Sequence, residues 1–321
     1  MSSSICVIGV DLGGQSVKLG VVRADGRVFL SRRLVVDATL PAGSIARLIC
    51  DGVSCLLSEA RVEGFEPVAV GMAVPGTMDR DRTRLELAVN LPTLSGSDFL
   101  SEVRRRLPLP VTFDADSNAA ALAEFRFGAG GDVSRLIVVA VGTGIGAGVV
   151  VDGSVVRVRG HTAGSLGHVV VDAQGPRCRC GGRGCVEVLA SGSAMERRAA
   201  ELVVEESSSQ LAILKAERGR LTGVEIGLAL KEGDEVAGRL VAECGRWLGV
   251  AIATWSVIYE PEKVLIGGGI AGLGEPFLAA VRSGFQEVGQ PAIVARTAIV
   301  WAALGADAGM IGAGAMVLPV K

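Results

Sequence analysis

Aromatic residues and histidines are scarce in this 321-residue sequence. Only 4% of the residues are aromatic and two are histidine, whereas 49% are hydrophobic and 45 are glycine. The hydrophobic cores must therefore be built mainly from Val, Leu, Ile and Ala. A chain of this length has room for two domains, each with a substantial core.

The sequence also lacks a basic cluster and a long apolar helix. Lys and Arg are scattered and the formal net charge is −2, so we expect no nucleic-acid partner and no membrane surface. The longest uncharged apolar stretch, 136–151, carries four glycines at alternate positions, which predicts strand–turn–strand. The apolar run 5–10 has no basic flank and is too short for a signal peptide. We therefore expect a soluble, cytoplasmic protein.

The seven cysteines do not suit a disulfide framework, because their number is odd. Three of them follow a histidine in the pattern H-x9-C-x-C-x4-C, formed by His168, Cys178, Cys180 and Cys185. One imidazole and three thiolates at this spacing predict a closed, tetrahedral structural zinc site. The alternative is three unliganded thiols packed together. The other cysteines are interpreted as small buried hydrophobes.

An internal repeat organises the chain. Segments 7–26 and 136–153 share one plan: strand, glycine turn, strand, Asp-Gly turn. This repeat predicts two similar domains, each beginning with a β-hairpin. The pattern predicts further strands at 67–73, 111–113 and 264–266, and helices at about 43–61, 97–106, 117–127, 193–206, 235–256 and 275–288. Their alternation predicts an α/β fold.

The domain change is expected near the helix over 117–127. Ser117 or Asp116 is the expected N-cap of that helix, and Gly128 its end. We assign residues 1–116 to the first domain and 117–304 to the second, larger one, which carries the zinc motif. The Ala- and Gly-rich stretch 308–318 suits close packing, so a C-terminal helix at about 305–321 is expected to complete the first domain.

Three glycine-rich turns follow buried strands. Glycine lets the backbone approach a phosphate closely, but a single such turn suits a plain hairpin equally well. Three of them at comparable places in two repeats favour a nucleotide between two domains. The turns are Gly13–Gly14, Gly142-Thr143-Gly144 and Gly267-Gly268-Gly269.

Six blocks of sequence resemble the ROK family (repressors, open reading frames and sugar kinases). The blocks run in family order over nearly the whole chain, and the block over 163–192, with the Cys/His pattern, is the most specific. The others are DLGGQSVKLG (11–20), GMAVPGTMD (71–79), DADSNAAALAEFRFGAG (114–130), VGTGIGAGVVVDG (141–153) and PEKVLIGGGI (261–270). The resemblance implies a two-domain, actin-like (ribonuclease H-like) ATPase fold with an interdomain cleft.

The resemblance further implies ATP-dependent phosphorylation of a hydroxyl on a hexose, an N-acetylhexosamine or a cyclitol. The cofactors would be ATP, Mg²⁺ and structural Zn²⁺, and the assembly a homodimer. The first glycine turn, with Asp11, Gln15 and Lys18, would handle Mg²⁺ and the phosphates. The second turn would close over them, and the third would lie beside the adenosine.

Asp116 matches the family's catalytic base, which accepts the proton of the attacking hydroxyl. Its alternative role as a helix N-cap is compatible with catalysis, because a cap would also hold the carboxylate still. His168, oriented by the zinc, and Glu187 would contact sugar hydroxyls. Asn90 and Gly76 also match acceptor-side positions of the family pattern.

Three positions depart from that pattern. Gln15 stands for the usual Thr, Ala115 for the usual Asn, and Ser165 for the usual Glu. Ala115 and Ser165 remove two groups that hold sugar hydroxyls, so we expect glucose to be a poor acceptor.

A catalytically weak sugar-sensing or regulatory protein is the alternative function. Retention of Asp116 speaks against it, whereas Gln15 leaves it open. Only ten residues precede Asp11, where the family's repressors carry a helix-turn-helix domain, so we expect no direct DNA binding.

Overall fold

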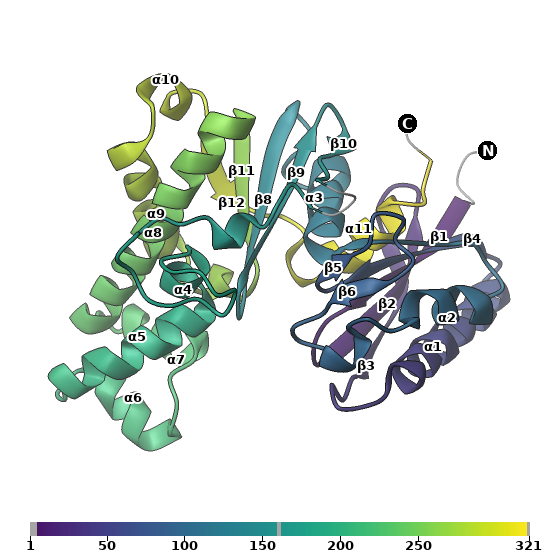
Figure 1. Ribbon diagram of the computed structural model, residues 1–321, viewed down its shortest axis with the longest axis horizontal. Helices are drawn as coiled ribbons and strands as arrows, with labels where there is room; N and C mark the ends of the chain where they lie inside the picture. The colour runs from purple at the N-terminus through teal and green to yellow at the C-terminus, as the bar shows by residue number, and fades with distance from the viewer. Residues whose placement is uncertain (1–4, 159–161, 320–321) are drawn as a thin grey trace. The chain divides into compact units, whose positions relative to one another are not determined.

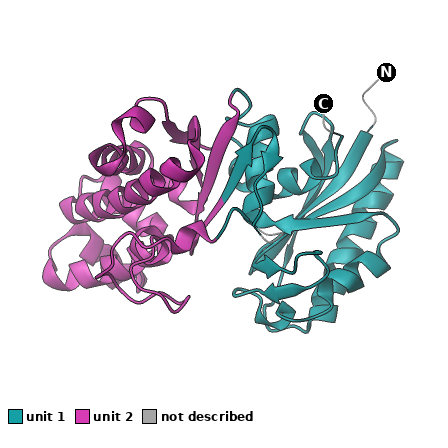
Figure 2. Ribbon diagram, turned by 45° about the horizontal axis from the view of Figure 1, so that its top comes forward, with its two compact units in different colours: residues 1–132, 148–164, 303–321 teal, residues 133–147, 165–302 magenta. Residues whose placement is uncertain are grey.

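The structure is a computed structural model that describes residues 5–158 and 162–319. The chain divides into two compact units (Figure 2): unit 1 comprises residues 1–132, 148–164 and 303–321, and unit 2 comprises 133–147 and 165–302. The boundary expected at 116/117 is displaced, because α3 (Asp116–Phe127) packs against α11 (Ala308–Ala315) within unit 1. Residues 320–321 of the expected C-terminal helix lie outside the described residues.

Unit 1 is built on a five-stranded sheet with the order β3-β2-β1-β4-β7 (Figure 1). β1 pairs antiparallel with β2 and parallel with β4, and β4 pairs parallel with β7. The strands are β1 (Ile5–Leu12), β2 (Ser16–Arg23), β3 (Val28–Val35), β4 (Glu66–Val74) and β7 (Val111–Ala115). A short ribbon of β5 (Thr77–Met78) and β6 (Leu85–Leu87) follows β4.

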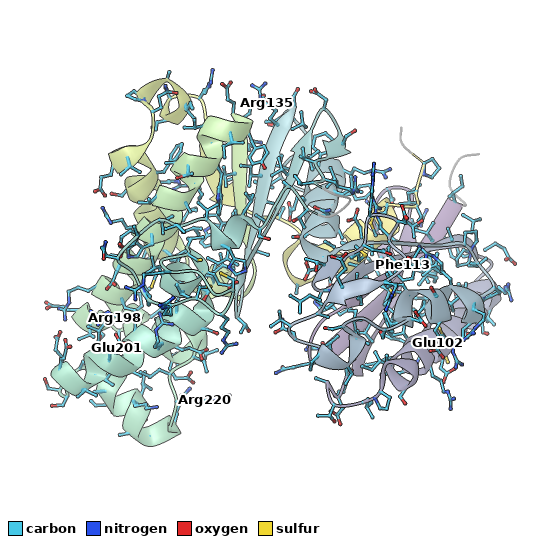
Figure 3. The ribbon with its side chains drawn as sticks, in the orientation of Figure 1. Glu102, Phe113, Arg135, Arg198, Glu201 and Arg220 are labelled. Carbon is cyan, nitrogen blue, oxygen red and sulfur yellow. The ribbon has the colours of Figure 1, made fainter. Side chains whose placement is uncertain are left out.

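The main core of unit 1 lies between the sheet and two helices, α1 (Ala42–Val62) and α2 (Phe99–Arg106). Apolar residues on one stripe of α1, including Ile45 and Ile49, are fully buried against sheet residues such as Leu12. Phe113 of β7, labelled in Figure 3, joins the same core. This burial, rather than intrinsic helix propensity, supplies most of the stabilisation of such helices.

Glycines let α11 approach the sheet and α3 closely. A Cβ at Gly71 would lie 1.7 Å from the carbonyl oxygen of Ala313, and one at Gly312 would lie 1.8 Å from that of Ala119. Any side chain at these positions would therefore force the elements apart. The close packing predicted for 308–318 is confirmed.

Helix α3 begins at Asp116 and its N-cap is Ala115, without a side-chain cap. The expectation that Ser117 or Asp116 caps it is wrong, because the helix starts one residue earlier than the pattern indicated. Gly128 does end the helix as predicted.

The second sheet has the order β10-β9-β8-β11-β12. Its strands are β8 (Arg135–Val141), β9 (Ile145–Val151), β10 (Ser154–Val155), β11 (Lys263–Gly267) and β12 (Ala298–Trp301). β11 pairs parallel with both β8 and β12, as β4 does with β1 and β7. The two sheets thus repeat one strand order, which confirms the internal repeat.

The helices of unit 2 lie between these strands in the chain, α4 to α8 before β11 and α9 and α10 before β12. They are α4 (Glu187–Ala190), α5 (Gly192–Glu205), α6 (Gln210–Arg218), α7 (Gly223–Lys231), α8 (Glu235–Tyr259), α9 (Glu275–Val288) and α10 (Pro291–Val294). Gly249 lets α8 and α9 pack closely. A Cβ at this position would lie only 2.3 Å from the carbonyl oxygen of Val281. Within the described residues, no helix has the length and apolar character needed to cross a bilayer.

Candidate active site

Asp11 is the next-to-last residue of β1 and pairs with Lys18 across the β1–β2 hairpin. The hairpin turns on Gly13–Gln15, where the Gly13 N–H donates to the carbonyl oxygen of Ser16 at 2.9 Å. Desolvation raises the pKa of Asp11 to about 6, and the neighbouring Asp116 carboxylate adds to this rise, whereas Lys18 opposes it. Of the predicted phosphate-side residues, Asp11 and Lys18 therefore lie together, with the Asp116 carboxylate as a charged neighbour.

The N-terminal turn of α11 completes this cluster. A Cβ at Gly309 would lie 2.6 Å from Cγ of Asp11, so only glycine allows the carboxylate to approach the helix here. Lys18 Nζ donates to the carbonyl oxygen of Ala306 and lies 3.9 Å from the Asp307 carboxylate. Asp307 was not identified as a site residue from the sequence. The one local feature that marks this residue is its position directly before the Gly-rich helix α11. Carboxylate oxygens are ligands that Mg²⁺ takes, so the donor chemistry of Asp11 and Asp307, whose charges interact, suits that ion.

Asp116 is the first residue of α3. Its Oδ1 accepts the backbone N–H of Ser117 at 2.7 Å, which holds the carboxylate in place. The side chain is accessible to solvent. Nevertheless, desolvation by the surrounding protein raises the pKa of its carboxyl, and the Ser117 N–H opposes that rise. A carboxylate with a raised pKa is a stronger proton acceptor while it stays ionised.

Two predicted acceptor-side residues lie on the loops that follow β4. Asn90 is beside the phosphate turn, because a Cβ at Gly14 would lie 3.0 Å from Cβ of Asn90. Gly76 has φ +97° and a Cβ there would lie 2.0 Å from the carbonyl oxygen of Leu87. The structure thus requires glycine at 76 for the tight approach of the loop to β6.

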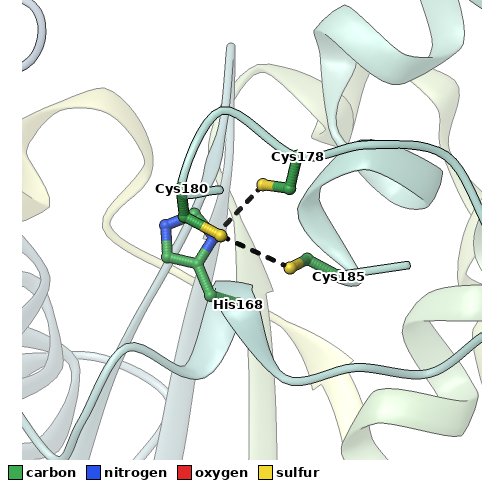
Figure 4. A group of neighbouring side chains, drawn as sticks. All are labelled: His168, Cys178, Cys180 and Cys185. Atoms are coloured by element: carbon green, nitrogen blue, oxygen red, sulfur yellow. Dashed lines mark hydrogen bonds between the residues drawn. The ribbon is translucent and has the colours of Figure 1, made fainter. Parts of the chain in front are cut away.

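The four predicted zinc ligands come together in unit 2 (Figure 4). One ligand atom from each of His168, Cys178, Cys180 and Cys185 lies within 4.8 Å of all the others. His168 Nδ1 is 3.6 Å from the sulfur of Cys178, and the sulfurs of Cys180 and Cys185 are 3.7 Å apart. A tetrahedral Zn²⁺ with ordinary bond lengths separates such atoms by about 3.6 Å (N to S) and about 3.8 Å (S to S). The arrangement therefore fits zinc.

Backbone hydrogen bonds hold the cysteine loop around this point. The Cys178 N–H donates to the carbonyl oxygen of Gly182 at 2.9 Å, and the Gly181 N–H to that of Cys178 at 3.0 Å. Gly184, at φ +65°, lies so close to Asp172 that a Cβ would be 1.5 Å from its carbonyl oxygen. Gly184 is thus required by the fold of the loop.

Glu187 joins this loop to the second glycine turn. Its Oε2 accepts the backbone N–H of Ile145 at 2.9 Å, and its Oε1 lies 4.0 Å from Nδ1 of His168. A Cβ at Gly144 would lie 2.4 Å from Oε2 of Glu187, so this glycine makes room for the carboxylate. Because Nδ1 of His168 faces the thiols and Glu187, Nε2 is the nitrogen left for another partner.

A cavity of about 570 Å³ in unit 2 adjoins the second and third glycine turns. This volume is within the range of small-molecule and cofactor sites. Gly142, Thr143 and Gly269 line it, together with residues of α5 and α7 that sequence reasoning missed, such as Met195 and Leu228. Gly144, Gly267 and Gly268 are not among its lining residues. Gly268, at φ +92°, instead packs against β8, where a Cβ would lie 2.4 Å from the carbonyl oxygen of Val141.

Helix α7, one wall of this cavity, begins with a capping box. The Thr222 side chain accepts the N–H of Val224, and Glu225 accepts the N–H of Thr222 at 2.8 Å. Glu225 also pairs with Arg218 at 3.1 Å. The Thr222 hydroxyl, the Thr222 N–H and Arg218 together lower the pKa of Glu225 to about 2.

We expect Glu225→Gln to lower the free energy of unfolding by roughly 1–1.5 kcal/mol, the difference between a hydrogen bond to a charged group and one to a neutral group. The amide can still accept the Thr222 N–H, but it no longer carries the charge that Thr222 and Arg218 stabilise. Because the pKa of Glu225 is lower in the folded protein, the difference in unfolding free energy between variant and wild type is largest above about pH 4.5. It shrinks as the pH falls toward 2, where Glu225 of the wild type is protonated. Urea unfolding at several pH values measures it, with the exposed Glu217→Gln as control. A difference that grows on acidification would contradict this account.

Comparison with solved structures assigns the fold class. The chain has the two-domain, actin-like ATPase fold of the ROK sugar kinases. The ROK glucokinase from Streptomyces griseus, solved with glucose and AMPPNP, matches with a TM-score of 0.80 and 31% identity, over 97% of this chain and 98% of that one.

The ROK family model matches residues 7–319, and the chain belongs to the ROK family. A glucokinase from Streptomyces coelicolor is 33% identical over 314 residues, which cover 95% of each chain. An N-acetylmannosamine kinase from Escherichia coli is 30% identical over 318 residues, covering 98% of this chain and 99% of that one.

Proposed function

We propose that this protein is an ATP-dependent carbohydrate kinase that phosphorylates a hydroxyl of a sugar or sugar-like acceptor, with Asp116 as general base. Its similarity to glucokinases and an N-acetylmannosamine kinase over nearly the whole chain supports the reaction class. The observation that carries the assignment of the base is the Asp116 carboxylate. It is fixed at the start of α3, close enough to Asp11 for the two charges to interact.

In this reaction the acceptor hydroxyl loses its proton to Asp116 as its oxygen bonds to the γ-phosphorus, while the bond from that phosphorus to the β–γ bridging oxygen breaks and ADP leaves. The raised pKa of Asp116 makes the carboxylate better able to take that proton. Asp11 and Asp307 would hold Mg²⁺, which neutralises phosphate charge when bound. Lys18, kept in place by Ala306 and Asp307, would add a positive charge on the phosphate side. The cavity beside Gly142 and Thr143 would take the adenosine.

The zinc assigned to His168 and the three cysteines is structural in this proposal. All four ligands come from the chain, which leaves no open position for substrate on the metal. The ion would fix the His168 ring and the loop that precedes Glu187, and these two side chains would contact acceptor hydroxyls. By resemblance to the family we also propose a homodimer, which sedimentation of the purified chain tests.

We further propose that the acceptor is an N-acetylated amino sugar or a cyclitol rather than glucose. Ala115 is buried beside the base, and Ser165 precedes the short helix η2 (Leu166–His168). Neither residue offers the carboxylate or amide that the family pattern carries there. Unpaired glucose hydroxyls would then be desolvated without compensation.

Missing one neutral and one charged hydrogen bond should weaken glucose use by roughly 2–4 kcal/mol, or about 30- to 1000-fold. The variant Ala115→Asn/Ser165→Glu should therefore raise kcat/KM for glucose and lower it for the true acceptor. An ATP-coupled assay over hexoses, N-acetylhexosamines and cyclitols, run on both proteins, measures this. Strong glucose preference in the unmodified protein would contradict the proposed acceptor class and leave the kinase assignment intact.

A further inference from the structure

Unit 1 contains a second cavity, of about 670 Å³, that includes none of the residues assigned to phosphoryl transfer. Its walls come from β7, the second half of α3, the β9–β10 turn and the segment that ends α11. Three arginines line it, Arg82, Arg126 and Arg157, against two carboxylates, Asp25 and Asp114. The cavity therefore carries one net positive charge.

The buried Asp114 is the centre of this charged group. Its Oδ1 accepts the N–H of Ala115 and the side-chain amide of Asn118, each at 2.8 Å. Its Oδ2 accepts Nε of Arg157 at 3.0 Å, is also bonded by Nη2 of that arginine, and lies 3.6 Å from Nη1 of Arg82. One fully buried carboxylate thus faces two guanidinium groups and can neutralise only one of them.

Both guanidinium groups are fixed by contacts other than Asp114. Arg157 Nη1 donates to the carbonyl oxygen of Val155 at 3.1 Å, and Arg82 Nη1 donates to that of Phe113 at 3.2 Å. The backbone of Arg82 has φ +53°, a costly conformation for a residue with a side chain, and Arg104 holds it by donating to its carbonyl oxygen at 2.9 Å. Such strain persists only where the surroundings impose it.

These arginines retain donors for a further acceptor. A guanidinium carries five N–H groups, and the hydrogen bonds described above use three of Arg157 and one of Arg82. Their side chains remain 27% (Arg82) and 28% (Arg157) exposed. Arg126, in contrast, is occupied by backbone carbonyl oxygens near the C-terminus, among them that of Ala315 at 2.6 Å.

We propose that this cavity binds a small phosphate-bearing ligand, whose phosphate is held by Arg82 and Arg157. Two guanidinium groups that reach the site from different parts of the chain can each donate two hydrogen bonds to the oxygens of a phosphate. Guanidinium is the side-chain group whose geometry matches phosphate best. The rings of Phe125 and Phe127 line the same cavity and offer apolar surface to a carbon skeleton. The volume accommodates a ligand of sugar-phosphate size.

The cavity is coupled to the proposed active site through Asp114. The same carboxylate that pairs with Arg157 bonds Ala115 and Asn118, which flank Asp116 at the start of α3. A phosphate bound by the remaining donors of Arg157 would share that guanidinium with Asp114 and so weaken its pairing with the carboxylate that also bonds the segment carrying the base. Ligand binding is therefore expected to change the rate of turnover. This effect on turnover rests on the proposed function, whereas the binding of the ligand is independent of it.

Isothermal titration of the full chain with glucose 6-phosphate and, separately, with inorganic phosphate tests the site, without ATP or Mg²⁺. Arg82→Gln leaves the Arg157–Asp114 pair intact and should weaken binding at least about tenfold, as loss of a charged hydrogen bond does. Arg157→Gln should do the same. Arg61→Gln, an exposed arginine of unit 1 away from the cavity, and Asn90→Ala, on the acceptor side, should leave affinity unchanged.

Tighter binding of glucose 6-phosphate than of phosphate would identify a phosphorylated metabolite as the ligand, and equal affinities would identify free phosphate; both support the site. The proposal is overturned if neither compound binds, or if Asn90→Ala weakens binding and Arg82→Gln does not. That second result would place the compound in the acceptor site. A protein without kinase activity would still show the predicted binding, so the two proposals fail separately.

Discussion

Replacing Asp116 by Asn is expected to lower kcat by about 10²–10⁴-fold, the usual contribution of a general base. Asn keeps the shape of the side chain and an oxygen that can accept the Ser117 N–H, so α3 should start where it does now. The substitution removes the proton acceptor and the negative charge that Asp116 places beside Asp11. The loss should therefore appear in kcat, measured with saturating ATP and acceptor.

Nucleotide binding provides the control for this variant. The cavity assigned to adenosine does not include Asp116, and neither do the glycine turns assigned to the phosphates, so the variant should still bind ATP. Asp98→Asn, an exposed aspartate before α2, should retain wild-type turnover. If Asp116→Asn phosphorylates its acceptor at a rate near that of wild type, the assigned base is wrong.

The second large effect is expected at the metal site. Protein prepared without chelators should contain about one zinc per chain, and Cys180→Ala should lose it, because a closed site needs all four ligands. Apparent binding energies of structural zinc reach about 10–16 kcal/mol in zinc-finger peptides, so loss of the ion should lower the melting temperature markedly. Acceptor use should fall as well, since the loop leads directly into Glu187.

Cys55→Ala is the matched control for this experiment. Cys55 is an exposed thiol on α1 of unit 1, contrary to the expectation that the cysteines outside the zinc motif are buried, which is wrong for this residue. Its removal should therefore change neither zinc content nor acceptor use. Elemental analysis, thermal unfolding and kcat/KM for the acceptor provide three independent readings. Zinc-free wild-type protein, or full activity in Cys180→Ala, would contradict the structural role of the metal.

The elements that the sequence predicted are those with strong periodic or alternating patterns. Helices α1, α8 and α9 and the two hairpins were placed within a few residues of their observed bounds. β3 was missed because it is an edge strand whose middle residues, Ser31 to Arg33, are exposed and polar, so it has no apolar alternation. Helices α6 and α7 are short, nine residues each, which leaves little room for a periodic signal.

The site residues, like the helices and strands, could be predicted only where they form a local sequence pattern. The zinc ligands are close in sequence, so their spacing alone predicted the cluster that the structure contains. Asp307, Arg82 and Arg157 reach their partners Lys18 and Asp114 over long separations in sequence. Isolated arginines and aspartates carry no local pattern, and only the packing of β7, α3 and α11 reveals them.

Direct detection of the phosphorylated product tests the central claim most directly. The purified chain would be incubated with ATP, Mg²⁺ and each compound of the acceptor panel, and the products separated and identified by mass spectrometry. The account predicts a sugar or cyclitol monophosphate whose formation requires ATP and is abolished or strongly slowed in Asp116→Asn. Sugar binding without any phosphorylated product, across the whole panel, would contradict it and favour a sugar-sensing protein that has lost catalysis.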